Sequence, residues 1–173
     1  MDKIKDIIIQ VEKLKLAGSF DAAITLLQES IATYNSDYRL YEEMADIFLY
    51  RGDLDKAVKA IDFALSLNLE SATGNYLKGF ILLSWDKVKE ALGYLEKSNK
   101  MMWNNAEVLR NLGWAYTIVW EHTKGISILK RALNLSPDDE LIVEDLAMAL
   151  IGSGEVQSGN VLLEKIGKKQ VSK

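Results

Sequence analysis

The heptapeptide GSFDAAI at residues 18–24 returns 34 residues later as GDLDKAV at residues 52–58. Both tracts begin with glycine, carry a bulky apolar residue third and have alanine sixth. Glycine readily ends a helix, and a small residue early in the next helix lets two helix backbones approach closely. The two tracts therefore predict helical hairpins in tandem, and a fixed spacing of this size is typical of stacked repeats.

The same 34-residue spacing divides the rest of the chain into aligned rows without insertion or deletion, and we call this alignment the repeat frame. Five rows align, at residues 4–37, 38–71, 72–105, 106–139 and 140–173. Small residues recur in fixed columns with bulky aliphatic residues between them, as interdigitated helix packing requires. One small column is Val11, Ala45, Gly79, Gly113 and Ala147, and another is Ala23, Ala57, Ala91, Gly125 and Gly159.

Helix boundaries repeat in this frame as well. Four rows place a residue that can cap a helix start in one column, namely Asp37, Ser71, Asn105 and Asp139. Three rows place glycine where the first helix of each pair must turn, at Gly18, Gly52 and Gly154. Asp86 and Trp120 occupy that turn column in the third and fourth rows and depart from the glycine pattern.

This register resembles the tetratricopeptide repeat, which also has a 34-residue period. The fourth row carries the family's W–LG–Y…A…P signature best, at Leu109, Leu112, Gly113, Tyr116, Ala132 and Pro137. The resemblance covers residues 4–173 and implies an all-α fold, a right-handed α-solenoid of five helix-turn-helix repeats with about ten antiparallel helices. It also implies a single domain over residues 1–173, in which the first helix of each pair lines a concave groove.

The sequence offers little for catalysis. The chain has no cysteine, which excludes disulfides and thiolate metal sites. Its only histidine, His122, lies in an otherwise apolar column that opens the second helix of each pair, so packing accounts for it. The acidic run at residues 138–140 fits a helix start better than a metal site. We therefore expect no enzyme, no cofactor and no metal.

Net charge and hydropathy exclude some classes of binding partner. A net charge of −4 lacks the basic footprint that nucleic-acid binding needs. No window approaches ~18 uninterrupted apolar residues, so no membrane span is expected. The first residues show no signal-peptide pattern, and a cytoplasmic location is the expectation.

The expected groove consists of first-helix positions that the repeat does not need for packing. In the first two rows these positions are charged, with an acidic excess at Glu12, Glu42, Glu43 and Asp46. In the later rows they are mainly aromatic and apolar, with Tyr76, Phe80, Leu83, Arg110, Asn111, Trp114 and Met148. Because Trp, Tyr and Arg dominate interface energetics, these seven, together with Glu12, Glu42 and Asp46, are the predicted peptide-binding residues. Packing between adjacent first helices is the alternative, above all for Phe80 and Met148.

The resemblance also allows one binding mode to be examined. A branch of the family clamps the C-terminal carboxylate of chaperones with lysine, asparagine and arginine at five positions. The corresponding positions here are Ile8, Glu12, Glu43, Thr73 and Leu77, and moving one row along gives Glu42, Asp46, Leu77, Glu107 and Asn111. Neither set fits an acidic tail. We expect instead a scaffold or adaptor for a protein or peptide with apolar side chains and a neutral or basic flank.

Two further hypotheses are compatible with the sequence. Part of the apolar set of the fifth row has no following row to cover it, which favours a homo-oligomer through the C-terminal repeat; the set is Val156, Val161, Leu162, Leu163 and Ile166. A chaperone-like holder of a hydrophobic client is the second alternative. Trp85, Trp103 and Trp120 fall at turns, where they either fill wedges between rows or form another surface patch.

Overall fold

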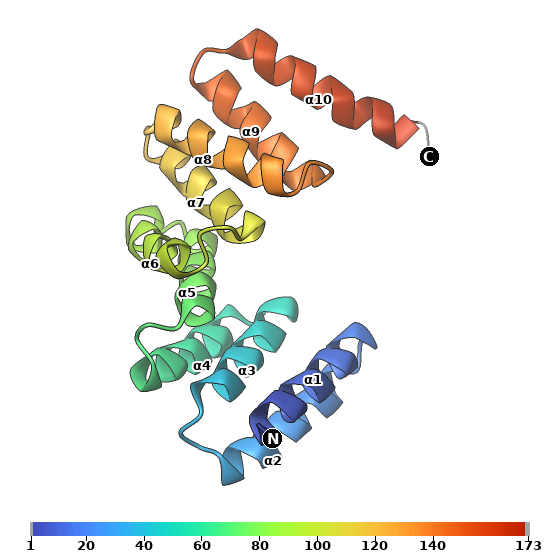
Figure 1. Cartoon of the computed structure of the whole chain (residues 1–173), viewed down its shortest axis with the longest axis vertical. Coiled ribbons are helices and arrows are strands. Elements are labelled where there is room, and N and C mark those ends of the chain that lie inside the picture. Colours follow the sequence, from blue (N-terminus) through green and yellow to red (C-terminus); the bar gives the residue numbers. More distant parts are fainter. Residues whose placement is uncertain (1, 172–173) are drawn as a thin grey trace. The chain divides into compact units, whose positions relative to one another are not determined.

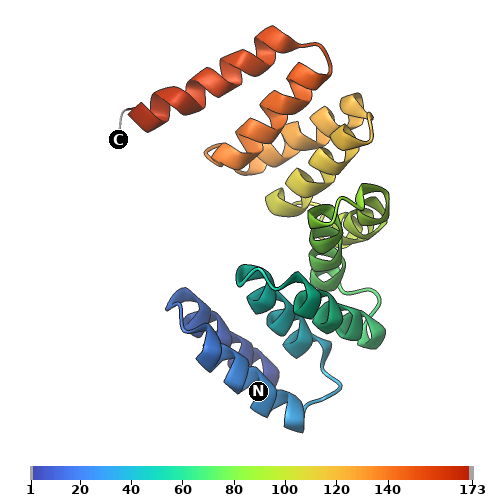
Figure 2. The same cartoon turned by 180° about the vertical axis from the view of Figure 1, so that it is seen from behind.

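The computed structural model describes residues 2–171 as ten α-helices joined by short turns (Figures 1 and 2). No strand occurs among these residues, so the predicted all-α class is confirmed. The helices are α1 (Lys3–Leu16), α2 (Phe20–Thr33), α3 (Tyr38–Tyr50), α4 (Leu54–Leu67), α5 (Ala72–Ser84), α6 (Val88–Met101), α7 (Ala106–Ile118), α8 (His122–Leu135), α9 (Glu140–Gly152) and α10 (Val156–Val171). Each row of the sequence frame supplies one pair.

The chain divides into two compact units, Met1–Ile81 and Leu82–Lys173. In the first unit α1 packs on α2 and α3 on α4, and α1 also lies beside α3 (Figure 1). In the second unit α7 pairs with α8 and α9 with α10, and α7 also contacts α9. The single domain expected from the sequence stays a prediction.

The four predicted helix caps are confirmed. Side-chain oxygens of Asp37, Ser71, Asn105 and Asp139 each accept a hydrogen bond from a backbone N–H in the next turn, at 3.0 to 3.2 Å. These bonds satisfy donors that a helix start leaves unpaired, and each is worth about 1 kcal/mol. The caps therefore fix where α3, α5, α7 and α9 begin.

All five turns between paired helices use one backbone conformation. The glycine column has positive φ at Gly18, Gly52 and Gly154, and so do Asp86 (φ 57°) and Trp120 (φ 68°). In every turn the next N–H donates to the carbonyl five residues earlier, at 2.8 or 2.9 Å. This is the hydrogen-bond pattern that ends a helix through a left-handed residue. The third and fourth rows thus keep the turn without its glycine.

The two small-residue columns face each other inside each hairpin. A Cβ placed on Gly125 would lie 2.7 Å from the carbonyl oxygen of Gly113, and one on Gly159 would lie 2.7 Å from that of Ala147. Such distances leave no room for a side chain. The sequence columns therefore record the points where α8 crosses α7 and α10 crosses α9.

Each unit has its own apolar core. In the first unit Val11, Leu27 and Leu40 are fully buried, and in the second unit Leu109 and Leu129 are. Burying each such side chain contributes about 1.5–3 kcal/mol. Within the described residues, no helix combines the length and the apolar character needed to cross a bilayer.

Candidate functional site

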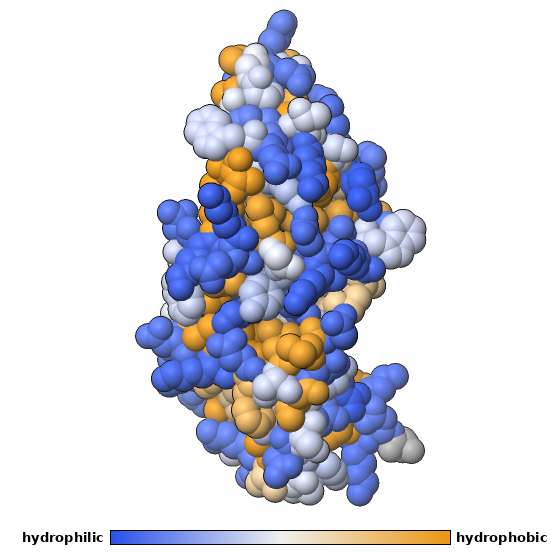
Figure 3. Space-filling model, turned by 90° about the vertical axis from the view of Figure 1, so that its left-hand side faces the viewer, coloured by the Kyte–Doolittle hydropathy of each residue, from blue (hydrophilic) through white to orange (hydrophobic). Residues whose placement is uncertain are grey.

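The first helices of the pairs share one column of accessible positions, which we call the first-helix column: Glu12, Asp46, Phe80, Trp114 and Met148. Glu12, Phe80 and Met148 are exposed, whereas Asp46 and Trp114 are half-buried. The column is acidic in α1 and α3 and apolar in α5, α7 and α9. Figure 3 shows one face of the molecule, where hydrophobic residues lie in separate groups among hydrophilic ones.

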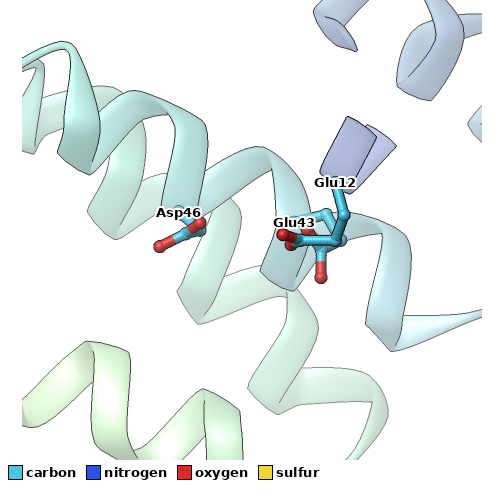
Figure 4. A group of neighbouring side chains, drawn as sticks. All are labelled: Glu12, Glu43 and Asp46. Atoms are coloured by element: carbon cyan, nitrogen blue, oxygen red, sulfur yellow. The ribbon is translucent and has the colours of Figure 1, made fainter. Parts of the chain in front are cut away.

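Three carboxylates of the first unit converge between α1 and α3. Glu12 comes from α1, and Glu43 and Asp46 come from α3 (Figure 4), with one oxygen of each within 4.8 Å of the others. The ammonium of Lys15 lies 2.6 Å from Glu12, 3.2 Å from Glu43 and 2.5 Å from Asp46. Lys15 thus neutralises part of a cluster that would otherwise repel itself, and it holds the two helices together.

The burial of this cluster alters how its members titrate. Burial raises the pKa of Glu43 to about 7, against the opposing charge of Lys15. Partial burial disfavours the charged form of Lys15, but ion pairs with Asp46 and Glu12 raise its pKa above the usual range. Lys15 is therefore cationic while Glu43 changes charge near neutral pH.

Glu42 does not lie on the exposed acidic surface, and that expectation is wrong. Its side chain is buried, accepts a hydrogen bond from the Ser71 hydroxyl, and belongs to the contact between α3 and the start of α5. Burial raises the pKa of Glu42, although the hydrogen bonds from Ser71 and from the Gly74 N–H oppose the shift. Glu42 links neighbouring repeats, and its predicted contact with a peptide remains untested.

In the second unit the accessible face of α7 and α9 carries the predicted arginine and tryptophan. The Arg110 Nε donates to Asp145 across the two helices at 2.6 Å, and both side chains are partly exposed. Burial raises the pKa of Asp145, although its ion pair with Arg110 opposes the shift. Trp114 is half-buried, whereas Met148 and Leu141 keep 48% and 53% of their surface.

Asn111 is also less accessible than expected. It is buried, and its amide donates to the carbonyl of Glu107 at 3.1 Å. Tyr76 and Phe80 belong to the first unit, with ring centroids 6.5 Å apart, and Leu83 is a half-buried residue of the second unit. The structure thus brings Tyr76 together with Phe80, and brings Arg110, Trp114 and Met148 onto the neighbouring helices α7 and α9.

Asp145 is the residue that sequence reasoning missed. It follows Arg110 by 35 residues, one more than the repeat period, so it lies one position along in the next first helix. The repeat period places Glu144 in the column of Arg110, so the spacing alone does not identify Asp145 as the partner. Glu12 and Glu43 both pair with Lys15, although they lie 31 residues apart, three fewer than the repeat period, and so fall in different columns.

The turn tryptophans differ in exposure. Trp120 is 82% exposed and Trp103 62% exposed, so neither fills a wedge between repeats, whereas Trp85 is half-buried. The Trp120 ring meets His122 edge-on, with centroids 5.7 Å apart. His122 begins α8, and neither of its ring nitrogens has a hydrogen-bond partner within the described part of the chain.

Comparisons with known proteins give distant relatives. No family model matches the chain. Anaphase-promoting complex subunit 7 from Dictyostelium discoideum is 27% identical over 115 residues, which is 66% of this chain. The match spans only 20% of that relative's length.

Solved structures resemble the whole chain more fully. The MamA fragment 41-end from Desulfovibrio magneticus RS-1 has a TM-score of 0.79 at 24% identity and covers 100% of this chain and 98% of its own. YrrB, described as a TPR protein with an unusual peptide-binding site, has a TM-score of 0.72 at 15% identity over 92% of this chain and 82% of its own. At these identities the likeness establishes the fold.

Proposed function

The chain has the tetratricopeptide-repeat fold, and we propose that it is a non-enzymatic interaction module that binds a peptide segment along the first helices of its pairs. The main support for this proposal is the face formed by α7 and α9. Exposed Met148 lies on α9, and half-buried Trp114 and ion-paired Arg110 lie on the neighbouring helix α7. Exposed apolar surface of this kind is typical of binding sites.

The face of α7 and α9 provides an apolar subsite. Met148 and Leu141 keep about half their surface, so the fold draws little stability from them and a ligand can bury them. Trp and Arg are enriched among residues that carry binding energy. Asp145 already holds the Arg110 guanidinium in place, so a ligand that packs on it loses less side-chain entropy.

The face of α1 and α3 provides an acidic subsite. Three carboxylates share one ammonium, so the cluster keeps negative charge even when Glu43 is protonated. Glu12 and Asp46 are its accessible members, with 47% and 39% of their side-chain surface exposed. A lysine or arginine of a ligand complements this charge, whereas an acidic tail is repelled.

The proposed ligand is therefore a protein segment with apolar side chains and a neutral or basic flank. The remaining predicted contacts, from Tyr76, Phe80 and Leu83, fall between these subsites in the sequence and extend the same proposal. Glu42 and Asn111 are buried, so a ligand could contact them only by passing the side chains that cover them. Of the predicted binding residues, these two are the weakest candidates.

Selection from a library of displayed random peptides tests this function. We expect peptides that combine apolar residues with lysine or arginine, bound in the micromolar range, which corresponds to about 8 kcal/mol. Trp114→Ala should weaken a selected peptide by at least about tenfold, whereas Leu135→Ala, at an exposed position on the second helix α8, should not. Equal binding by both variants, with folding intact, would exclude the proposed face.

A further inference from the structure

A cleft of about 330 Å³ lies in the second unit, where the middle of α10 passes the turn between α8 and α9. Its floor is apolar and is formed by Leu133, Val143, Leu162 and Ile166. All four side chains are only partly buried. The fold therefore leaves a hollow with an apolar floor, and neither Arg110 nor Asp145 lines it.

The two walls of this cleft carry opposite charges. Glu140 lies in the first turn of α9, Asp138 precedes that helix on the same wall, and Lys165 comes from α10. Neither Glu140 nor Lys165 forms an ion pair with any residue in the part of the chain that the structure describes. Among those residues, Glu140 and Lys165 thus leave a charge on each wall that no ion pair neutralises.

An apolar floor between unpaired charges of opposite sign is a self-complementary surface. A two-fold axis through such a surface places the positive wall of one copy against the negative wall of the other, and it does so twice. Leu162 and Ile166 lie one helical turn apart on α10, so a second copy presents the same apolar pair to this surface. A ligand of single charge would complement only one wall.

We propose that this cleft is the docking surface for a second copy of the chain. Residues 162–166 of α10 in one copy pack against the same residues of the other, so that Leu162 and Ile166 meet their counterparts and Lys165 of one copy faces Glu140 of the other. The surface does not involve the first-helix column, so this proposal stands or falls separately from the peptide-binding function.

Light scattering on the full chain, across low to high micromolar concentrations, tests the proposal. We expect a reversible dimer whose mass falls to that of the monomer on dilution. Lys165→Glu should raise the dimer Kd by at least about tenfold, because both symmetric ion pairs become repulsive. Lys130→Glu, at an exposed position on α8, is the matched charge reversal and should leave the Kd unchanged.

A charge-exchange experiment identifies the paired residues. Chains with Lys165→Glu and chains with Glu140→Lys should each be mainly monomeric, yet an equal mixture should dimerise, because both inter-copy pairs are then attractive again. Circular dichroism of each variant checks that the helices remain. A wild-type chain that stays monomeric, a dimer indifferent to Lys165→Glu, or a mixture that stays monomeric would each overturn the proposal.

Discussion

Trp120 occupies a backbone position that favours glycine. Its φ of 68° lies in the left-handed region, which bulky side chains rarely adopt because Cβ crowds the backbone. The side chain is 82% exposed, so burial does little to offset that strain. Its ring meets that of His122 edge-on. The chain therefore retains this tryptophan at a cost in stability.

Replacing Trp120 with glycine should stabilise the protein. We expect Trp120→Gly to raise the free energy of unfolding by roughly 1 kcal/mol, since strain in this region costs about 1–3 kcal/mol. Urea denaturation measures the change. Asp86→Gly, at the equivalent turn with φ 57°, is the comparison and should gain less, because aspartate tolerates this conformation better than a bulky residue. A loss of stability in Trp120→Gly would mean that the contact with His122 outweighs the strain.

Glu43 gives the protein a pH-dependent stability. Its pKa is raised from 4.5 to about 7 in the folded state, so between these values the native chain binds more protons than the unfolded chain. The free energy of unfolding from this group therefore falls as pH rises through that window. Glu43→Gln should be more stable than wild type at about pH 8, and the difference should shrink toward about pH 5.

Urea midpoints at both pH values provide the measurement. Asp55→Asn serves as the control, because it removes an exposed carboxylate of α4 outside the cluster. A Glu43→Gln chain that is less stable than wild type at the higher pH would show that the ion pair with Lys15 outweighs the burial of Glu43.

At the residue scale, the sequence predicts which helix a side chain belongs to better than it predicts whether that side chain is buried. The repeat frame identified Glu42 and Asn111 as first-helix positions, and they are, yet both are buried. The frame gives the direction of a side chain from its own helix axis. It does not show that the start of α5, with Ser71, covers Glu42.

At the scale of elements, each hairpin depends on close backbone contact. A Cβ on Gly125 would meet the Gly113 carbonyl oxygen at 2.7 Å and the Thr117 hydroxyl at 2.5 Å. Because Gly113 is itself in a helix, the backbone oxygen cannot move aside without displacing α7. The α7–α8 pair therefore needs glycine at position 125.

Gly125→Ala should destabilise the protein by about 1–3 kcal/mol, which is the usual range for overpacking. Gly93→Ala in α6 is the matched control, because a Cβ there meets nothing within 4 Å. That control should be stabilised by roughly 0.5–1 kcal/mol through helix propensity. Thermal denaturation distinguishes the two, and similar shifts for both variants would show that the hairpin does not pack as tightly as described.

Much at this scale could be predicted from the sequence. The frame located all five turns, and the four caps of α3, α5, α7 and α9 are those expected. These features depend on local backbone chemistry, so they are visible when the five 34-residue rows are aligned. The pairing of Arg110 with Asp145 depends on how neighbouring first helices align, which the columns alone do not give.

At the scale of the whole molecule, the proposed function divides between the units. The first unit carries the acidic cluster around Lys15, and the second carries the apolar face of α7 and α9. The acidic subsite favours a basic ligand residue, and the apolar subsite favours apolar ligand side chains. Electrostatic attraction between exposed groups is screened by salt, while apolar contact is not.

Salt should therefore separate the two contributions. A peptide selected by the chain should lose affinity between low and high ionic strength, by about tenfold if one basic residue meets the cluster. The double variant Glu12→Gln and Asp46→Asn should lower affinity at low salt and reduce the salt dependence. Isothermal titration measures both effects, and an unchanged salt dependence in the double variant would remove the acidic subsite from the account.

The most direct test of the central claim is to map a selected peptide onto the labelled chain by nuclear magnetic resonance. Peptide binding should shift the amide signals of α7 and α9, above all around Trp114 and Met148, and should leave the signals of the second helices α8 and α10 largely unchanged. Shifts confined to α8 and α10, or shifts absent from α7 and α9, would contradict the claim that the first helices of the pairs bind the ligand.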